Sequence, residues 1–206
     1  MKALLINGSP RERGCTYTAL SELAQTLEAE GIETELVQAG ARTTHGCIAC
    51  GKCRETGKCV FDDVVNETAP KLAQADALVI GAPVYYASPA GGAISFMDRL
   101  FHSTGIDMTM KVGASVVSCR RGGNTSSFDV LNKYFTIAGM PIASSQYWNM
   151  VYGSTPEEVR KDLEGLQTMR TLGRNMAFLM KSIALGKAQY GLPEKEKSIV
   201  TSFHHD

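Results

Sequence analysis

Four of the six cysteines in this 206-residue chain lie close together in the sequence. They follow the spacing C-x2-C-x2-C-x5-C and are Cys47, Cys50, Cys53 and Cys59. In a reducing cytosol such a group indicates metal or redox chemistry rather than structural disulfides. One loop with this spacing can wrap four thiolates around an iron–sulfur cubane, as in ferredoxins. Two other interpretations stay open: free packing or redox thiols, and a zinc site, for which the tight start of the run is less typical.

A second polar group follows the short apolar run at residues 2–7. These residues supply three hydroxyls and one cation, some just before a predicted helix and some in its first turn: Ser9, Arg11, Thr16 and Thr18. A helix N-terminus offers free N–H groups and the positive end of a dipole, so this loop predicts a monophosphate site. The spacing matches neither G-x-G-x-x-G nor the Walker lysine loop, which disfavours a dinucleotide or triphosphate. The alternative is a polar loop that only caps the helix.

A third group lies where another buried strand is predicted to end. The sequence there runs Gly-Ala-Pro-Val-Tyr-Tyr over residues 81–86. In a doubly wound sheet, the strand ends near the switch point line the ligand crevice. Tyr85 and Tyr86 have the shape to hold a flat ring, although two tyrosines can equally fill the edge of a core.

Taken together, residues 5–11, residues 81–86 and the Phe-Met-Asp-Arg at 96–99 resemble the NAD(P)H-dependent FMN reductases of the flavodoxin superfamily. The resemblance covers about residues 1–150. It implies that the FMN phosphate is held by the loop near residue 9, that the isoalloxazine is flanked by residues 83–86, and that the loop after residue 118 closes over the flavin. The implied residues are Ser9, Arg11, the Cys15 amide and Thr16; Pro83, Val84, Tyr85 and Tyr86; and Ser118, Arg120, Gly122 and Gly123. Thr18 is a further candidate from the hydroxyl pattern alone. Cys15 departs from the Asn or Ser that relatives often carry, which leaves a backbone contact possible but not an equivalent side-chain contact.

The cysteine run is similar to that of the iron–sulfur flavoproteins, a subgroup in which it binds a [4Fe–4S] cluster next to FMN. The resemblance implies an NAD(P)H-dependent flavin oxidoreductase that passes electrons to a small-molecule or protein acceptor and forms a homodimer or homotetramer. Because the flavin performs the chemistry, no catalytic acid or base is assigned. A second hypothesis is an electron carrier that serves partner proteins without oxidising NAD(P)H. Asp98 and Arg99 are interpreted as a structural ion pair beneath the flavin loop.

Apolar periodicity predicts five strands that alternate with helices. Such alternation favours a flavodoxin-like, doubly wound, five-stranded parallel sheet with helices on both faces. The last helix is expected to begin at residue 156 and to run to about residue 185, with a break at Gly173. The predicted strands are 2–7, 32–37, 77–81, 111–118 and, more weakly, 141–148; the other predicted helices are 16–30, 64–74, 89–101 and 126–138.

The length suits one domain, here residues 1–190 with a cysteine-rich insertion at 41–62, followed by a C-terminal tail at 191–206. Charged residues make up 20% of the chain and its formal net charge is zero. A neutral chain lacks the basic surface that nucleic acids or anionic membranes require, so neither is an expected partner. No stretch has the apolar length of a signal peptide or spanning helix, and we therefore expect a cytoplasmic protein.

Overall fold

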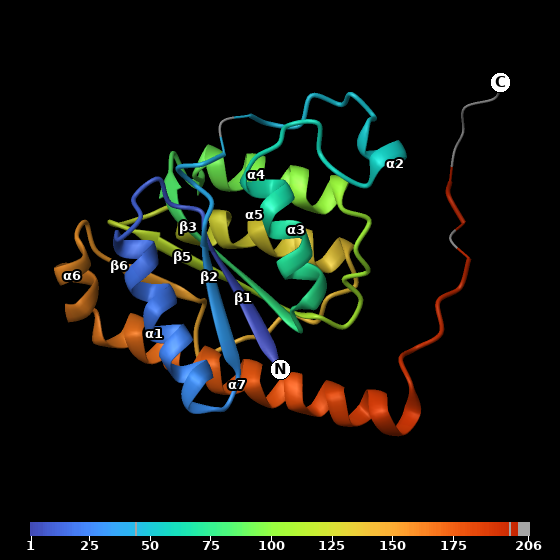
Figure 1. The fold of residues 1–206 in the computed structure, drawn as a ribbon. Helices are drawn as coiled ribbons and strands as arrows, with labels where there is room; N and C mark the ends of the chain where they lie inside the picture. Colours follow the sequence, from blue (N-terminus) through green and yellow to red (C-terminus); the bar gives the residue numbers. More distant parts are fainter. Residues whose placement is uncertain (44, 198, 202–206) are drawn as a thin grey trace.

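The computed structural model describes residues 1–43, 45–197 and 199–201. Its centre is a parallel sheet in the order β2-β1-β3-β5-β6 (Figure 1). Neighbouring strands of this path pair in parallel, and a short strand, β4, pairs antiparallel with the end of β3. The predicted flavodoxin-like sheet of five parallel strands is therefore confirmed. The strands are β1 (Lys2–Asn7), β2 (Glu33–Gln38), β3 (Ala77–Tyr85), β4 (Ser88–Pro89), β5 (Val112–Cys119) and β6 (Met150–Tyr152).

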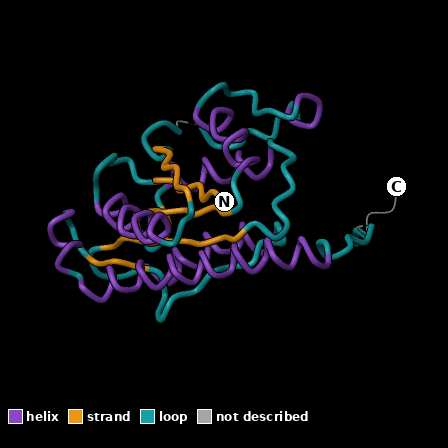
Figure 2. The backbone as a smooth tube through the Cα atoms, turned by 60° about the horizontal axis from the view of Figure 1, so that its bottom comes forward, coloured by secondary structure: helices purple, strands orange, loops and turns teal. Residues whose placement is uncertain are grey.

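Helices cover both faces of the sheet, as Figure 2 shows with the strands between two helical layers. Alternate residues along a strand pack into two hydrophobic cores, one on each face of the sheet. In β1, Leu4 and Ile6 pack on one face and Ala3 and Leu5 on the other. This period of two is what a strand buried on both sides requires. On the first face lie α3 (Val64–Gln74), α4 (Gly91–Ser103) and α5 (Asn124–Ile137); on the second lie α1 (Cys15–Ala29) and α7 (Leu163–Tyr190).

The fifth strand is not where the sequence predicts it. Of the predicted strand 141–148, Ile142 makes an isolated bridge to Gly113, and the paired strand β6 begins only at Met150. The Ser145 hydroxyl donates to the Tyr147 carbonyl over 2.6 Å and bonds the Asn149 side chain over 2.7 Å. Such local side-chain bonds compete with strand pairing and favour a turn.

The last predicted helix also differs. It is divided in two, but at Asp162 and not at Gly173, giving α6 (Pro156–Lys161) and an unbroken α7. The Asp162 carboxylate accepts hydrogen bonds from the N–H groups of Tyr152 and Gly165, so it caps the new helix. A Cβ added at Gly173 would lie 2.8 Å from the Cβ of Thr26. Gly173 therefore marks the close approach of α7 to α1.

Smaller shifts occur at two helix starts. Pro89 belongs to β4, so α4 begins at Gly91, and α5 begins at Asn124, two residues before its predicted start. The described part of the tail, residues 191–201 without 198, has no helix or strand and extends from the end of α7 (Figure 1). The rest of the predicted tail lies outside the described residues. No helix in the described part of the chain combines the length and apolar character needed to cross a membrane.

Candidate cofactor sites

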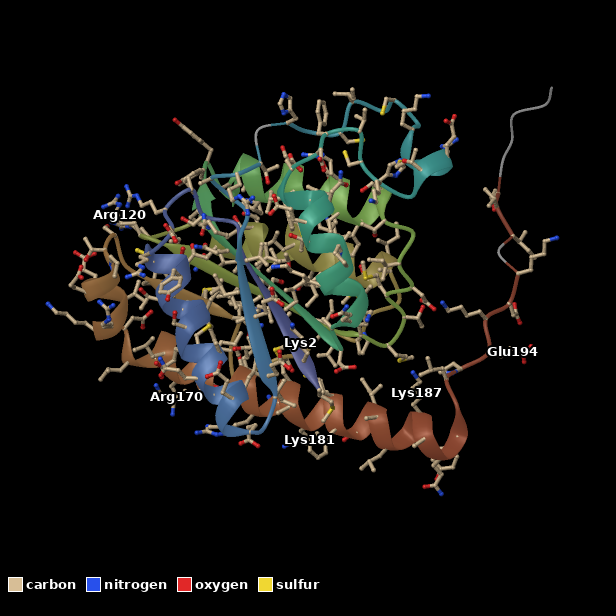
Figure 3. The ribbon with its side chains drawn as sticks, viewed as in Figure 1. Lys2, Arg120, Arg170, Lys181, Lys187 and Glu194 are labelled. Carbon is tan, nitrogen blue, oxygen red and sulfur yellow. The ribbon has the colours of Figure 1, made fainter. Side chains whose placement is uncertain are left out.

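A cleft opens where the carboxyl ends of the parallel strands meet. Its walls come from the loop after β1, the ends of β3 and β5, and the segment after β6, which is the place where open α/β sheets bind ligands. Arg120 projects from this edge of the sheet (Figure 3). The lining residues are Ser9, Arg11, Cys15, Thr16, Pro83, Val84, Tyr85, Ser118, Cys119, Arg120, Gly153 and Ser154.

The loop after β1 is held by Asn7, a residue that the sequence did not single out. Its side chain is fully buried and accepts a hydrogen bond from the Ser9 N–H over 3.1 Å. The amide of Asn7 also donates to the Glu12 carbonyl over 3.1 Å and to the Gln38 side chain over 2.6 Å. The Ser9 hydroxyl in turn accepts from the Arg11 N–H over 3.1 Å. These bonds fix the loop before any ligand arrives.

The N-terminus of α1 carries unmet hydrogen-bonding capacity. Gly14 occupies the N-cap position, and no side chain caps the helix and no acidic residue stands in its first turn. The first N–H groups of the helix therefore remain available to an anion. Within the described ranges, neither Arg11 nor Arg120 pairs with a carboxylate. The cleft thus offers positive charge and N–H donors together.

Two hydroxyls join opposite walls of the cleft. Thr16 at the start of α1 and Ser118 at the end of β5 lie 2.8 Å apart, oxygen to oxygen. Two thiols lie beside them, and burial is the main cause that raises the pKa of Cys15 and of Cys119. Both thiols therefore stay protonated near neutral pH, which suits a lining role better than a nucleophilic one.

A tight hairpin forms the rim of the cleft. β3 continues to Tyr85, and the turn before β4 places Tyr86 and Ala87 at φ of 50° and 57°. Non-glycine residues rarely adopt this left-handed region, so the turn stores strain. The Ser126 hydroxyl donates to the Ala87 carbonyl over 2.7 Å, and a Cβ at Gly123 would lie 2.6 Å from the Ala87 Cα. The base of α5 thus supports the hairpin.

Most of the predicted flavin residues come together in this cleft, but four do not line it. The Thr18 hydroxyl donates to the Gly14 carbonyl within α1. Tyr86 points fully into solvent, Gly122 is exposed, and Gly123 lies against Ala87 of the hairpin rather than in the cleft wall. Three lining residues were not predicted as binding residues: Cys119, which ends β5, and Gly153 and Ser154, which only the fold brings to this edge after β6.

The cysteine loop runs the length of α4. A Cβ at Gly92, in the first turn of α4, would lie 2.7 Å from the Gly40 carbonyl oxygen. At the other end, the Cys53 sulfur lies 4.0 Å from the His102 carbonyl oxygen. Figure 1 shows the segment arching over α4, with α2 (Cys53–Thr56) at its outer end. The loop leaves the carboxyl edge of the sheet after β2, and its four cysteines lie at the far end of α4.

All four clustered cysteines line one small cavity at that end. Cys47 and Cys50 are exposed, whereas Cys53 and Cys59 are half-buried. Among the described residues, no three His, Cys, Asp or Glu side chains are placed to hold a single metal ion. The cavity is also lined by Ile48, Ala49, Gly51, Val60, Phe61, Arg99, His102 and Ser103.

Arg99 does not pair with its neighbour Asp98, contrary to the interpretation from the sequence. It forms an ion pair with Asp63, whose carboxylate lies 2.7 Å from the guanidinium, while Asp98 accepts a hydrogen bond from the Tyr134 hydroxyl. Asp63 also caps α3 by accepting from the Val65 N–H. Burial opposes ionisation of Asp63, but the hydrogen bonds and charge of Arg99 prevail and lower the pKa of Asp63.

Comparison with known proteins places this geometry in a family. Residues 1–155 match the sequence profile of a family described as NADPH-dependent FMN reductase. An iron-sulfur flavoprotein of Methanocaldococcus jannaschii is 32% identical over 191 residues, covering 89% of this chain and 99% of the relative. The chain belongs to the NADPH-dependent FMN reductase family, in its iron-sulfur flavoprotein subgroup. Membership of the FMN reductase family makes it a flavin-dependent oxidoreductase.

Solved structures agree on the fold of this family member. RosB, determined with 8-demethyl-8-formylriboflavin-5'-phosphate, aligns over 100% of this chain and 92% of its own, with a TM-score of 0.71 and 17% identity. An NAD(P)H:quinone oxidoreductase from Methanothermobacter marburgensis aligns over 85% of this chain and 96% of its own, with a TM-score of 0.64 and 16% identity. At such identities the likeness supports the flavodoxin-like fold alone.

The two sites of the FMN reductase chain offer different sets of donor atoms. The cleft supplies an uncapped helix N-terminus, four serine and threonine hydroxyls, and two arginines that pair with no carboxylate among the described residues, which fits a phosphate-bearing flavin. The cavity supplies four sulfur ligands from one loop, which fits a cubane with one thiolate per iron.

Proposed function

We propose that the protein is an FMN-dependent NAD(P)H oxidoreductase in which a [4Fe–4S] cluster relays electrons to a small-molecule or protein acceptor. The observation that carries the proposal is the uncapped α1 N-terminus facing a cleft built from the carboxyl ends of β1, β3 and β5. Family membership supports the same assignment. We infer that residues 1–190 form the FMN domain, with 41–62 as its insertion, and that the protein works in the cytoplasm, where thiols stay reduced.

The residues of the cleft divide by role. Ser9, Arg11 and the first N–H groups of α1, including that of Cys15, bind the phosphate, with Thr16 beside them. Pro83, Val84 and Tyr85 provide an apolar and aromatic wall for a flat ring. Arg120 places positive charge at the same cleft and favours negative charge that develops there. FMN, when bound, supplies hydride and single-electron transfer, while the protein supplies binding and orientation.

The proposed cluster ligands are Cys47, Cys50, Cys53 and Cys59, and their shared cavity supports this proposal. The C-x2-C-x2-C-x5-C spacing favours a cubane over zinc, for which the tight start of the run is less typical. A bound cluster carries single electrons. Free thiols remain the competing interpretation, and iron analysis of protein made without oxygen separates the two.

Within one chain the two sites are far apart. α4 has 13 residues, and at about 1.5 Å per residue it separates cleft from cavity by roughly 20 Å. An assembly that brings the cysteine loop of one subunit to the cleft of another shortens this path. The proposal therefore includes a homodimer or homotetramer.

The second candidate is an electron carrier that does not itself oxidise NAD(P)H, since the cavity and cleft equally suit transfer between proteins. Anaerobic mixing with NADPH and, separately, NADH distinguishes the two. Bleaching of the flavin absorbance within seconds, lost in Ser9→Ala with Arg11→Ala, supports the enzyme. If dithionite bleaches the flavin but neither NADPH nor NADH does, the result contradicts the enzyme and supports the carrier.

A further inference from the structure

Arg99 is only 1% exposed, yet every one of its donors is used. Its two terminal nitrogens donate to both carboxylate oxygens of Asp63, over 2.7 and 2.9 Å. They also reach the backbone carbonyls of His45, over 3.3 Å, and Phe61, over 3.2 Å. The remaining donor, Nε–H, points to the Cys59 sulfur over 3.1 Å. A guanidinium has five N–H groups, so Arg99 is fully satisfied only with that sulfur as acceptor.

Cys59 is fixed at its backbone as well. Its N–H donates to the Asn66 side-chain oxygen over 3.0 Å, and the Asn66 amide donates to the Cys59 carbonyl over 3.0 Å. Cys47 and Cys50, in contrast, are exposed to solvent. The last cysteine of the run is therefore anchored to α3 and α4, while the first two lie on the open part of the loop.

The Nε–H bond to sulfur is separate from the ion pair with Asp63. Burying a guanidinium is costly, and the bidentate pair with Asp63 offsets that cost. The Phe61 ring, 5.1 Å from the guanidinium carbon, adds a cation–π contact. Nε–H, in contrast, stabilises negative charge on Cys59, and hydrogen bonds to ligand sulfurs are one of the features that set iron–sulfur potentials.

We propose that Arg99 is a positioning residue for the cluster, holding Cys59 as the preorganised ligand and raising the reduction potential of the cluster through its Nε–H bond to the sulfur. The inference rests on the proposed [4Fe–4S] site. Reduction adds one electron from an external reductant to the cluster and breaks no bond at Cys59. The added negative charge strengthens the Nε–H bond, so the bond favours the reduced form.

The test compares Arg99→Lys with Asp63→Asn. Lysine keeps the charge and can still pair with Asp63, but it lacks the Nε–H donor to sulfur. Asp63→Asn keeps that donor and removes the ion-pair partner instead. Each anaerobic holoprotein is titrated with dithionite and mediator dyes, and iron and FMN contents are measured. We expect R99K to favour the oxidised cluster about tenfold, which corresponds to a fall of about 59 mV in the one-electron reduction potential. We expect no fall of the potential in D63N.

The inference is overturned if the cluster of R99K has the same reduction potential as that of the natural chain. It is also overturned if the potential falls as far in D63N as in R99K. If R99K fails to retain iron, the natural chain labelled with 15N-arginine provides the test. Pulsed electron paramagnetic resonance of its reduced cluster should detect coupling to an arginine nitrogen. The same coupling should persist in the control variant Arg54→Lys. Absence of that coupling overturns the inference. A natural chain that holds no iron at all instead contradicts the proposed function, so the two failures are distinguishable.

Discussion

At the scale of single residues, Ser9 and Arg11 are the proposed phosphate ligands, and Arg11 pairs with no carboxylate among the described residues. Replacing both Ser9 and Arg11 by alanine removes a hydroxyl and a cation from the cleft. Hydrogen bonds to charged groups contribute about 1.5–3 kcal/mol each, so FMN affinity should fall by more than about tenfold. Fluorescence titration of the flavin-free protein measures the change.

Arg13 is the matched control for this experiment. It is exposed, carries the same charge and does not line the cleft. Arg13→Ala should leave FMN affinity within about twofold of the natural chain. Equal losses in both variants would show a general charge effect and remove the site assignment.

The cysteines of the cleft should differ in reactivity from those of the loop. Burial raises the pKa values of Cys15 and Cys119, so at pH 7 they hold even less thiolate than an ordinary cysteine. In iron-free protein, iodoacetamide should therefore modify Cys47 and Cys50 first. The rates at Cys15 and Cys119 should keep rising as the pH increases through 9, because a raised pKa moves thiolate formation to higher pH. Mass spectrometry at timed intervals gives each rate.

FMN provides the control for that labelling. Bound in the cleft, it should slow modification of Cys15 and Cys119 further and leave the exposed Cys47 unchanged. Protection of Cys47 with no protection of Cys119 would place the flavin elsewhere.

At the scale of elements, two glycines in α7 make opposite predictions. At Gly173 an added Cβ meets Thr26 at 2.8 Å, whereas at Gly186 nothing lies within 4 Å. Gly186→Ala should stabilise the helix by up to about 1 kcal/mol, since alanine has the better helix propensity. Gly173→Ala should destabilise the fold by about 1–3 kcal/mol, because overpacking separates α7 from α1.

Urea unfolding of the cofactor-free chain measures both glycine variants under one condition. If G173A stabilised the chain, the result would contradict the close contact between α7 and α1. The glycine would then affect only the local stability of its own helix. A loss of stability in G186A would show that α7 is constrained at a point where the structure leaves open space.

The elements show where sequence reasoning succeeds. The strands at 2–7 and 111–118 were predictable because their apolar runs are local signals, and the cysteine spacing and the loop after β1 are local as well. Gly173 was mistaken for a helix break because its reason lies in Thr26, far away in the sequence. The role of Asn7 was missed for a related cause, because its bond to Gln38 forms only when β2 pairs with β1. Arg99 was paired with Asp98, its neighbour, when the fold offers Asp63.

At the scale of the whole molecule, α7 leaves apolar side chains without cover. Phe178 and Leu185 are 71% and 73% exposed and lie seven residues apart, on one stripe of the helix, followed by the exposed Tyr190. We expect this stripe to be buried between subunits of the natural chain. Light scattering at micromolar concentration should give a dimer or tetramer, and Phe178→Glu with Leu185→Glu should lower the mass. A natural chain that is monomeric under these conditions contradicts the assembly.

The central claim is that one chain holds two separate cofactors, FMN in the cleft and a [4Fe–4S] cluster in the cavity. The most direct test is the FMN and iron content of protein made and purified without oxygen, beside that of Cys50→Ala. We predict roughly one FMN and about four irons per natural chain, and loss of the iron with retention of FMN in C50A, because Cys50 lines the cavity and not the cleft. Natural chains that carry FMN but no iron would contradict the account and leave the four cysteines as free thiols.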